Sequence, residues 1–213
     1  MKGILSIVVA GALFAGSANA ELMEFDLESE GDGLVTLDTN SGLMWLDLTV
    51  TGGKSISQVK GMLANGELEG WRLPTAQDVY DLALSTFSAL DDTSGTYLYL
   101  PTAAEDVEQF SLMGQNSGAY TYGQYEIDGE GTYLLGAFPN KVTINYQLDR
   151  YYNTQNNDSQ DVNRIYDGVF LVSTNYDMAI SGSEIKNISD VPAPLAFASL
   201  ALMGMLTGRR KQQ

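Results

Sequence analysis

The sequence predicts a mixed fold in which β-strands and α-helices both contribute to one core. The first elements along the chain are predicted to be strands, because apolar residues alternate over residues 34–38 and dominate residues 43–48. Helices are predicted over residues 56–64 and 76–87, where apolar side chains recur at the 3.6-residue spacing of one helix face. The length of 213 residues allows one such domain, or one domain with short signals at its ends.

The boundaries of these elements follow from local chemistry. Ser55 and Thr75 precede the two helices and can cap them, because their hydroxyl oxygens accept hydrogen bonds from first-turn backbone amides. Asn65-Gly66 ends the first helix. Further strands are predicted at residues 97–100, 120–125, 132–138, 142–148 and, as a buried closing strand, 167–173, with a loop at 153–163.

Composition excludes several classes of function. The chain has no cysteine and no histidine, which excludes disulfide frameworks, cysteine nucleophiles, Ser-His-Asp triads and His-Cys zinc sites. It has 11 basic and 27 acidic residues, a formal net charge of −16. Such a charge repels a phosphate backbone, so we expect no nucleic-acid partner.

Residues 1–20 have the features of a secretory signal peptide. Lys2 gives a basic start, residues 4–14 are almost entirely apolar, and Ala18-Asn19-Ala20 places small residues before the expected cleavage site. We expect signal peptidase to release an exported chain that begins at Glu21. A single domain is expected over residues 21–190, where seven basic and 27 acidic residues give a net charge of −20.

Residues 191–213 have three parts: a proline motif, a short apolar stretch and a basic end. The apolar stretch, residues 195–207, is short for a permanent membrane anchor, which needs about 20 residues. The basic end favours a cytoplasmic C-terminus. The motif and the basic end are formed by Val191, Pro192, Pro194, Arg209, Arg210 and Lys211.

This tail resembles the PEP-CTERM sorting signal, in which a Val-Pro-x-Pro motif, a short apolar helix and an Arg-rich end follow one another. The family's commonest motif has Glu between the prolines, where this chain has Ala193. The resemblance implies recognition by an exosortase and transient anchoring in the inner membrane by the C-terminal helix. The expected destination is the cell surface or the extracellular matrix. An ordinary tail anchor is the alternative.

Two further motifs lie on either side of the first predicted helix. A turn and strand read Gly-Leu-Met-Trp at residues 42–45, and Gly-Trp-Arg-Leu-Pro-Thr at residues 70–75 opens the second helix. Together they resemble a bacterial surface domain that also occurs at the C-terminus of collagen-like adhesins. The Arg-Leu-Pro-Thr helix start is similar to that of formylglycine-generating-enzyme-like domains, whose oxidase chemistry needs cysteines that this chain lacks. The residues that mark the fold are Trp45, Gly70, Trp71, Arg72, Pro74 and Thr75.

This second resemblance implies an α+β, C-type-lectin-like fold. Two helices would pack on a twisted antiparallel sheet, beside a long irregular loop region at residues 91–160. Trp45 and Trp71 would anchor the helices to the sheet as core residues rather than as sugar-stacking platforms. Arg72 would pair with a carboxylate, either Asp47 or Asp78.

No catalytic residue is expected. Without histidine or cysteine, general acid–base catalysis would need a pair of carboxylates, and the sequence singles out none of the 27. A secreted glycan-active hydrolase that uses such a pair is therefore the alternative function. No cofactor is expected, although acidic loops at residues 26–32, 91–94, 128–130 and 156–161 leave a structural calcium ion as an alternative.

Tyrosine is the other compositional bias, with 12 in the chain and most of them between residues 97 and 152. Tyrosine side chains are frequent in binding surfaces and equally at home in strands. We select Tyr120, Tyr122 and Tyr125 as a surface for polysaccharide or a surface protein, although strand alternation places Tyr125 opposite the other two. The expected function is non-catalytic binding at the cell surface or in the matrix.

Overall fold

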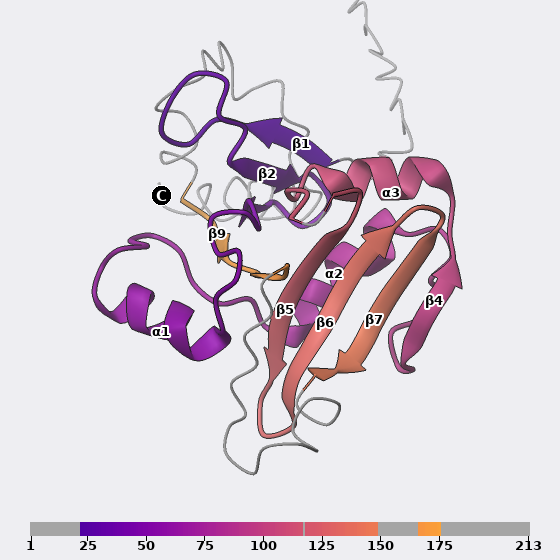
Figure 1. The fold of residues 1–213 in the computed structure, drawn as a ribbon. Helices are drawn as coiled ribbons and strands as arrows, with labels where there is room; N and C mark the ends of the chain where they lie inside the picture. Colours follow the sequence, from indigo (N-terminus) through magenta and orange to yellow (C-terminus); the bar gives the residue numbers. More distant parts are fainter. Residues whose placement is uncertain (1–21, 117, 149–165, 176–213) are drawn as a thin grey trace, which may run out of the picture.

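The computed structural model describes residues 22–116, 118–148 and 166–175 (Figure 1). This part of the chain contains three helices and two β-sheets, which confirms the predicted mixed α+β class. The expectation of two helices on one sheet is wrong. A third helix forms within the region predicted to be irregular, and the closing segment divides its backbone hydrogen bonds between two sheets.

The first sheet is antiparallel, with its strands in the order β1-β2-β3-β9. Its members are β1 (Leu22–Phe25), β2 (Val35–Asp38), β3 (Leu43–Leu46) and β9 (Val172–Ser173). The turn between β2 and β3 contains Gly42 at a φ of 71°, a conformation that glycine adopts without a Cβ clash. The first glycine of the Gly-Leu-Met-Trp motif is therefore required by the turn.

The second sheet has the order β4-β7-β6-β5-β8, and four of its five strands lie within the region predicted to be irregular. Its long strands pair antiparallel, and only β8 runs parallel to its neighbour β5. The strands predicted at residues 97–100, 120–125, 132–138 and 142–148 are thus confirmed. The expectation of an irregular region is wrong for its described part, residues 91–116 and 118–148, which contains these strands and helix α3. The members are β4 (Tyr97–Pro101), β5 (Thr121–Ile127), β6 (Gly131–Phe138), β7 (Lys141–Gln147) and β8 (Gly168–Val169).

The two predicted helices form where expected, and each begins with a capping box. Ser55 and Thr75 accept hydrogen bonds from the backbone amides three residues on, which opens α1 (Ile56–Ala64) and α2 (Ala76–Thr86). The third helix, α3 (Ala104–Ser111), has no side-chain cap. Helix α2 lies behind strands β5 to β7 in the view of Figure 1.

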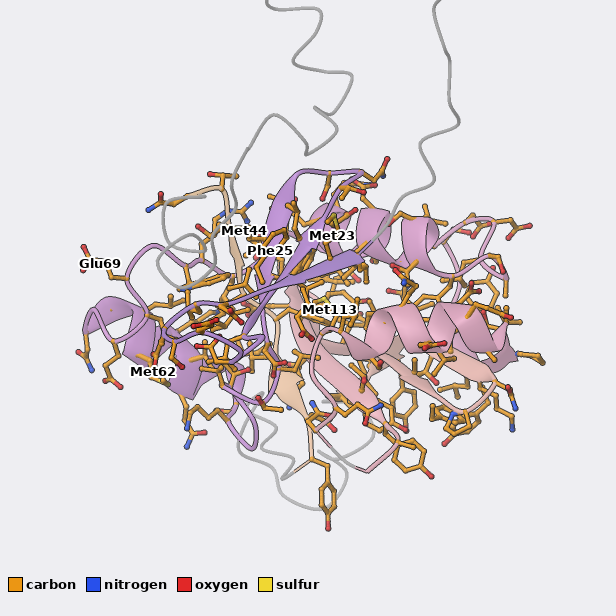
Figure 2. The ribbon with its side chains drawn as sticks, turned by 90° about the horizontal axis from the view of Figure 1, so that it is seen from above. Met23, Phe25, Met44, Met62, Glu69 and Met113 are labelled. Carbon is orange, nitrogen blue, oxygen red and sulfur yellow. The ribbon has the colours of Figure 1, made fainter. Side chains whose placement is uncertain are left out.

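Two large apolar cores hold these elements together, and a third, small cluster surrounds Leu134 and Leu148. The larger core lies between the second sheet and helices α2 and α3, and the smaller one between the first sheet and α1. Met113 marks the larger core and Met62 the edge of the smaller one in the view from above (Figure 2). Strand β3 buries side chains in both, because Trp45 enters the larger core and Met44 the smaller one. This explains why β3 is apolar at every position.

Residues 168–173 join the two sheets. The amide of Phe170 donates a 3.0 Å hydrogen bond to the carbonyl of Gln124, and the amide of Leu46 donates a 3.0 Å bond to the carbonyl of Leu171. The ring of Phe170 packs edge-on against Trp45, with 5.6 Å between ring centroids. The closing segment is buried as predicted, and it ties the two sheets into one folded unit.

Candidate functional site

The three tyrosines selected from the sequence separate onto two faces of β5. Tyr120 and Tyr122 share the outer face, and their rings stack at a centroid distance of 5.8 Å. Tyr125 points into the core, where it is 1% exposed and its hydroxyl donates a 2.6 Å hydrogen bond to Asn145. The expectation that Tyr125 contributes to a surface is therefore wrong. Its odd position on an alternating strand places it opposite the other two.

Tyr120 and Tyr122 belong to a larger group of contacting rings, partly buried and partly exposed, here called the aromatic patch. Phe138 lies 5.8 Å from Tyr120 and 6.4 Å from Tyr122 between ring centroids. Tyr99 packs edge-on against Phe138 at 5.2 Å, and the ammonium group of Lys141 lies 5.8 Å from the Tyr99 ring and 6.0 Å from the Phe138 ring. Tyr99 is 60% exposed and Tyr120 is 41% exposed. The aromatic patch therefore consists of Tyr99, Tyr120, Tyr122, Phe138 and Lys141.

Tyr99 reaches the patch through a break in the register of β4. The pairing between β4 and β7 shifts between Tyr97 and Leu100, and Tyr99 has a φ of 60°, which is unusual for a residue with a bulky side chain. A left-handed residue of this kind costs about 1–2 kcal/mol, and such strain is concentrated at functional sites. The alternating pattern of the sequence does not predict this break. Tyr99 is therefore absent from the binding residues selected from the sequence.

Phe138 and Lys141 are adjacent because a two-residue turn joins β6 to β7. Pro139 and Asn140 occupy the turn, with Asn140 at a φ of 62°, and Phe138 pairs with Lys141 across it. Proline followed by a left-handed Asn is typical of a type II turn. The Pro-Asn dipeptide was a readable signal for this hairpin, and it would have placed both residues beside each other.

Tyr122 rests on the backbone of Gly136 in the neighbouring strand. A Cβ at Gly136 would overlap the Tyr122 ring, so only glycine leaves room for this packing. Gly136 and Tyr122 are register partners across β5 and β6. The glycine thereby fixes the ring at one edge of the patch, which keeps the neighbouring Tyr120 ring in its stacked position.

A separate cavity of about 660 Å³ opens beside α2, on the core side of the second sheet. A cavity of this size can hold a small organic ligand. Burial and the nearby carboxylate of Glu130 raise the pKa of the Tyr80 hydroxyl, so this group stays protonated as a hydrogen-bond donor. The cavity is lined by Gln77, Tyr80 and Leu84 of α2, residues 91–96, and Ile127, Glu130, Tyr133 and Asn145.

The wall of this cavity is held by one buried amide. The side chain of Asn145 donates hydrogen bonds of 2.7 Å to the carbonyl of Thr93 and 2.9 Å to that of Gly95. The backbone carbonyl of Asn145 accepts a 3.2 Å bond from the Thr96 hydroxyl. Asn145 itself sits at a register break in β7 with a φ of 57°. The loop over residues 93–96 is thus tied to the sheet.

The Gly-Trp-Arg-Leu-Pro-Thr motif has a structural role in the described fold. Gly70 takes a φ of 83°, and Trp71 is buried in the smaller core. Of the two carboxylates expected to pair with Arg72, Asp78 is the partner, at 3.0 Å. Asp78 also accepts a hydrogen bond from the backbone of Thr75, which completes the capping box of α2. The motif connects the start of α2 to the first sheet.

In the acidic loop at residues 26–32, two of the four carboxylates bind backbone amides of the loop and its immediate neighbour Gly33. Asp32 accepts hydrogen bonds from the backbone amides of Leu27, Glu28 and Ser29 at 2.7–2.9 Å, and Asp26 accepts them from Gly31 and Gly33. In the described ranges, no group of three or more acidic side chains gathers closely enough to hold a metal ion. The loop at 156–161, also considered for calcium, lies outside the described residues.

A glycosidase of the carboxylate-pair type needs a carboxyl group that stays protonated near neutral pH. Desolvation raises the pKa of Asp47, although hydrogen bonds from Thr49 oppose the shift. Asp47 packs so closely against the Gly114 backbone that no Cβ would fit at Gly114. This carboxyl group does not line the cavity, where the acidic residues are Asp91, Asp92 and Glu130.

The two expected terminal signals, residues 1–20 and 191–213, lie outside the described residues, and so do the six residues expected to act in sorting. Among the helices of the described ranges, none has the length and apolar composition needed to cross a membrane.

The chain was compared with family models, with curated proteins and with solved structures, and none of the three comparisons found a match.

Proposed function

We propose that this protein is exported to the cell surface or extracellular matrix and binds polysaccharide there without catalysis. The observation that carries the proposal is the aromatic patch, in which tyrosine and phenylalanine rings contact one another at the surface of a rigid sheet. Aromatic rings offer flat apolar area, and tyrosine hydroxyls add hydrogen-bonding groups beside it. That combination suits a sugar ring, which has apolar C–H faces and a polar edge.

Rigidity supports a binding role for the patch. Tyr122 is fixed against Gly136, Phe138 is set by a two-residue turn, and Tyr99 is held at a strained register break. Tyrosine side chains lose little conformational entropy when they bind, and rings already fixed by their neighbours lose less still. A patch prepared in this way can bind a repeating polymer weakly at each unit and strongly along its length.

Export and sorting complete the proposal. Signal peptidase would cleave after Ala20, and an exosortase-type enzyme would act on the C-terminal signal after transient anchoring in the inner membrane. A C-type-lectin-like arrangement of the core is part of the same proposal. The two capped helix starts and the packing of Trp45 and Trp71 are consistent with the resemblance from which it comes.

The test is affinity electrophoresis in gels that contain exopolysaccharide purified from the host, or hydroxyethyl cellulose as a neutral probe. The double variant Tyr99→Ala/Tyr120→Ala removes the two most exposed rings of the patch and spares the packed Tyr122. We expect its affinity to fall at least about tenfold, since contact residues of this kind each contribute about 1–3 kcal/mol. Tyr166→Ala is the matched control, because Tyr166 is 55% exposed and lies outside the patch.

If the polysaccharide slows the double variant in the gel as strongly as it slows the parent, the patch is not the binding surface. Binding of a surface protein with no polysaccharide retardation would assign the patch to a protein partner instead. Release of reducing ends by the parent, lost on substitution of a single Asp or Glu, would favour the hydrolase alternative.

A further inference from the structure

The cavity beside α2 differs in chemistry from the aromatic patch and lies on the other face of the same sheet. Tyr133 of β6 lines the cavity and packs against the larger core, whereas Phe138 belongs to the patch. These residues have opposite parity on a strand whose side chains alternate between faces. A polymer bound on the patch therefore leaves the cavity free for a second contact.

The charged groups that line the cavity are all negative. Asp91 and Asp92 come from the loop before β4, Glu130 comes from the β5–β6 hairpin, and no Lys or Arg is among the described residues of the lining. The carboxylate of Asp92, together with desolvation and the carboxylate of Asp91, raises the pKa of the Tyr97 hydroxyl, so the negative field extends over this loop. A wall of one sign favours a ligand of the opposite charge.

Two tyrosine rings complete the wall. Tyr80 comes from α2 and Tyr133 from β6, and the Tyr133 hydroxyl donates a 3.2 Å hydrogen bond to Glu130. An aromatic face beside a carboxylate is the environment that organic ammonium groups prefer, since the ring quadrupole and the carboxylate both attract the cation. The cavity offers this pairing in a volume of about 660 Å³, which has room for one sugar unit and part of its neighbours along a chain.

We propose that this cavity binds a protonated amino sugar, so that the protein recognises polysaccharide that carries free amines. The inference rests on the proposed function and names its substrate class. The ammonium group pairs with one or two of the carboxylates of Asp91, Asp92 and Glu130, while the apolar face of the sugar ring packs on Tyr80 or Tyr133. An acetylated amine carries no charge and gains nothing from the three carboxylates.

An organic cation fits the cavity better than a metal ion does. Calcium requires six to eight oxygen ligands around one point, and the described acidic groups do not form a three-carboxylate cluster. One carboxylate oxygen of Asp92 already accepts hydrogen bonds from the amide and the hydroxyl of Ser94, both at 2.9 Å, which makes it a poorer ligand for a metal ion. An ammonium group on a sugar needs only two or three acceptors.

The test is isothermal titration of the full mature protein with glucosamine tetramer and with N-acetylglucosamine tetramer, in about 0.15 M salt to screen non-specific attraction. The variant Asp91→Asn/Glu130→Gln removes two negative charges from the cavity, and the amide oxygen introduced by Glu130→Gln can still accept the hydrogen bond from Tyr133. The control Glu67→Gln/Glu69→Gln removes the same charge from exposed positions, and Glu69 lies beside α1 (Figure 2).

We expect the parent to prefer the glucosamine tetramer and the cavity variant to lose at least about tenfold of that affinity. The control and the patch variant Tyr99→Ala/Tyr120→Ala should keep the parent's ratio of amine to acetamide affinities. Equal binding of both tetramers by the parent, or equal losses in the cavity variant and its charge-matched control, would overturn the inference. So would displacement of the tetramer by millimolar calcium, or stronger binding of a lysine peptide of equal charge.

The two proposals fail separately. If the cavity variant binds both tetramers like the parent while the patch variant loses neutral polysaccharide, the amino-sugar site is wrong and the proposed function stands. If the patch variant keeps neutral polysaccharide, the proposed function is wrong whatever the cavity binds. Thermal melting of each variant beforehand ensures that only folded proteins are compared.

Discussion

The hydroxyl of Tyr125 donates a 2.6 Å hydrogen bond to the side-chain carbonyl of Asn145, and both groups are buried beneath the second sheet. Burial raises the pKa of Tyr125 well above its usual range, so the hydroxyl remains a donor at all physiological pH values. The amide of Asn145 in turn donates to Thr93 and Gly95. One buried side chain thereby connects β5, β7 and the loop that lines the cavity.

The first prediction separates the two roles of Asn145, its hydrogen bonds and its left-handed backbone. Asn145→Gly removes the side-chain hydrogen bonds and leaves the Tyr125 hydroxyl without its acceptor, which should lower the free energy of unfolding by about 1–3 kcal/mol. Asn145→Ala removes the same bonds but keeps a Cβ at a φ of 57°, so it should be about 1–2 kcal/mol less stable than Asn145→Gly. Urea unfolding measures both values. Equal stabilities of the two variants would show that the backbone is not strained there.

The second prediction concerns Trp71, which is 8% exposed in the smaller core. Trp71→Ala should lower the free energy of unfolding by about 3–5 kcal/mol, a large part of a typical stability of about 5–15 kcal/mol. Denaturant unfolding followed by circular dichroism gives the value, with the exposed Tyr166→Ala as a reference expected to change it by less than about 0.5 kcal/mol. If the midpoint of denaturant unfolding is unchanged and polysaccharide binding is weakened, Trp71 contacts the ligand and is not a core residue.

The third prediction is a loss of stability in acid. Partial desolvation opposes ionisation of Asp32, but hydrogen bonds from Leu27, Ser29 and Glu28 outweigh it and lower the pKa to about 2. The unfolded chain binds this proton at about pH 4, so the folded state is favoured above that pH and loses the advantage as pH falls toward 2. The melting temperature should therefore decline over this interval, and less steeply in Asp32→Asn. Parallel curves for the two proteins would contradict the assignment.

Sequence predicted the helix starts and most strands because those signals are local. Ser55 and Thr75 satisfy first-turn amides from three residues away, and both form capping boxes in the structure. Helix α3 was missed because Ala103 provides no side-chain cap and the helix fully buries only Phe110. The helix is amphipathic, but eight residues with two large apolar side chains, Val107 and Phe110, form too short a pattern to predict a helix.

The division into two sheets, and the place of Tyr99 in the aromatic patch, depend on contacts that local patterns do not contain. Residues 168–173 read as one apolar strand, yet the chain turns at Phe170 and pairs with β5 on one side and β3 on the other. Tyr99 and Asn145 are placed by register breaks in neighbouring strands, which result from long-range pairing. Alternation did correctly separate Tyr125 from Tyr120 and Tyr122.

The fourth prediction concerns the C-terminal signal. Replacement of Arg209, Arg210 and Lys211 together by Gln removes the charge that would hold the C-terminus in the cytoplasm, so sorting should fail and the precursor should accumulate. Intact-mass analysis of cell and matrix fractions from the host measures this directly, and it also reports cleavage after Ala20. Delivery of the triple variant to the surface at the parent's level would show that the tail is not a sorting signal.

The fifth prediction tests the central claim, that the aromatic patch holds this protein in a polysaccharide matrix. The measurement is the fraction of protein that the host matrix retains after washing. It is compared for the parent, Tyr99→Ala/Tyr120→Ala and Tyr166→Ala, after thermal melting has shown that the three proteins are equally stable. We predict that the patch variant is released into the wash while the parent and Tyr166→Ala are retained, because only the patch variant lacks the exposed rings that contact the polymer. Retention of the folded patch variant at the parent's level would contradict the account.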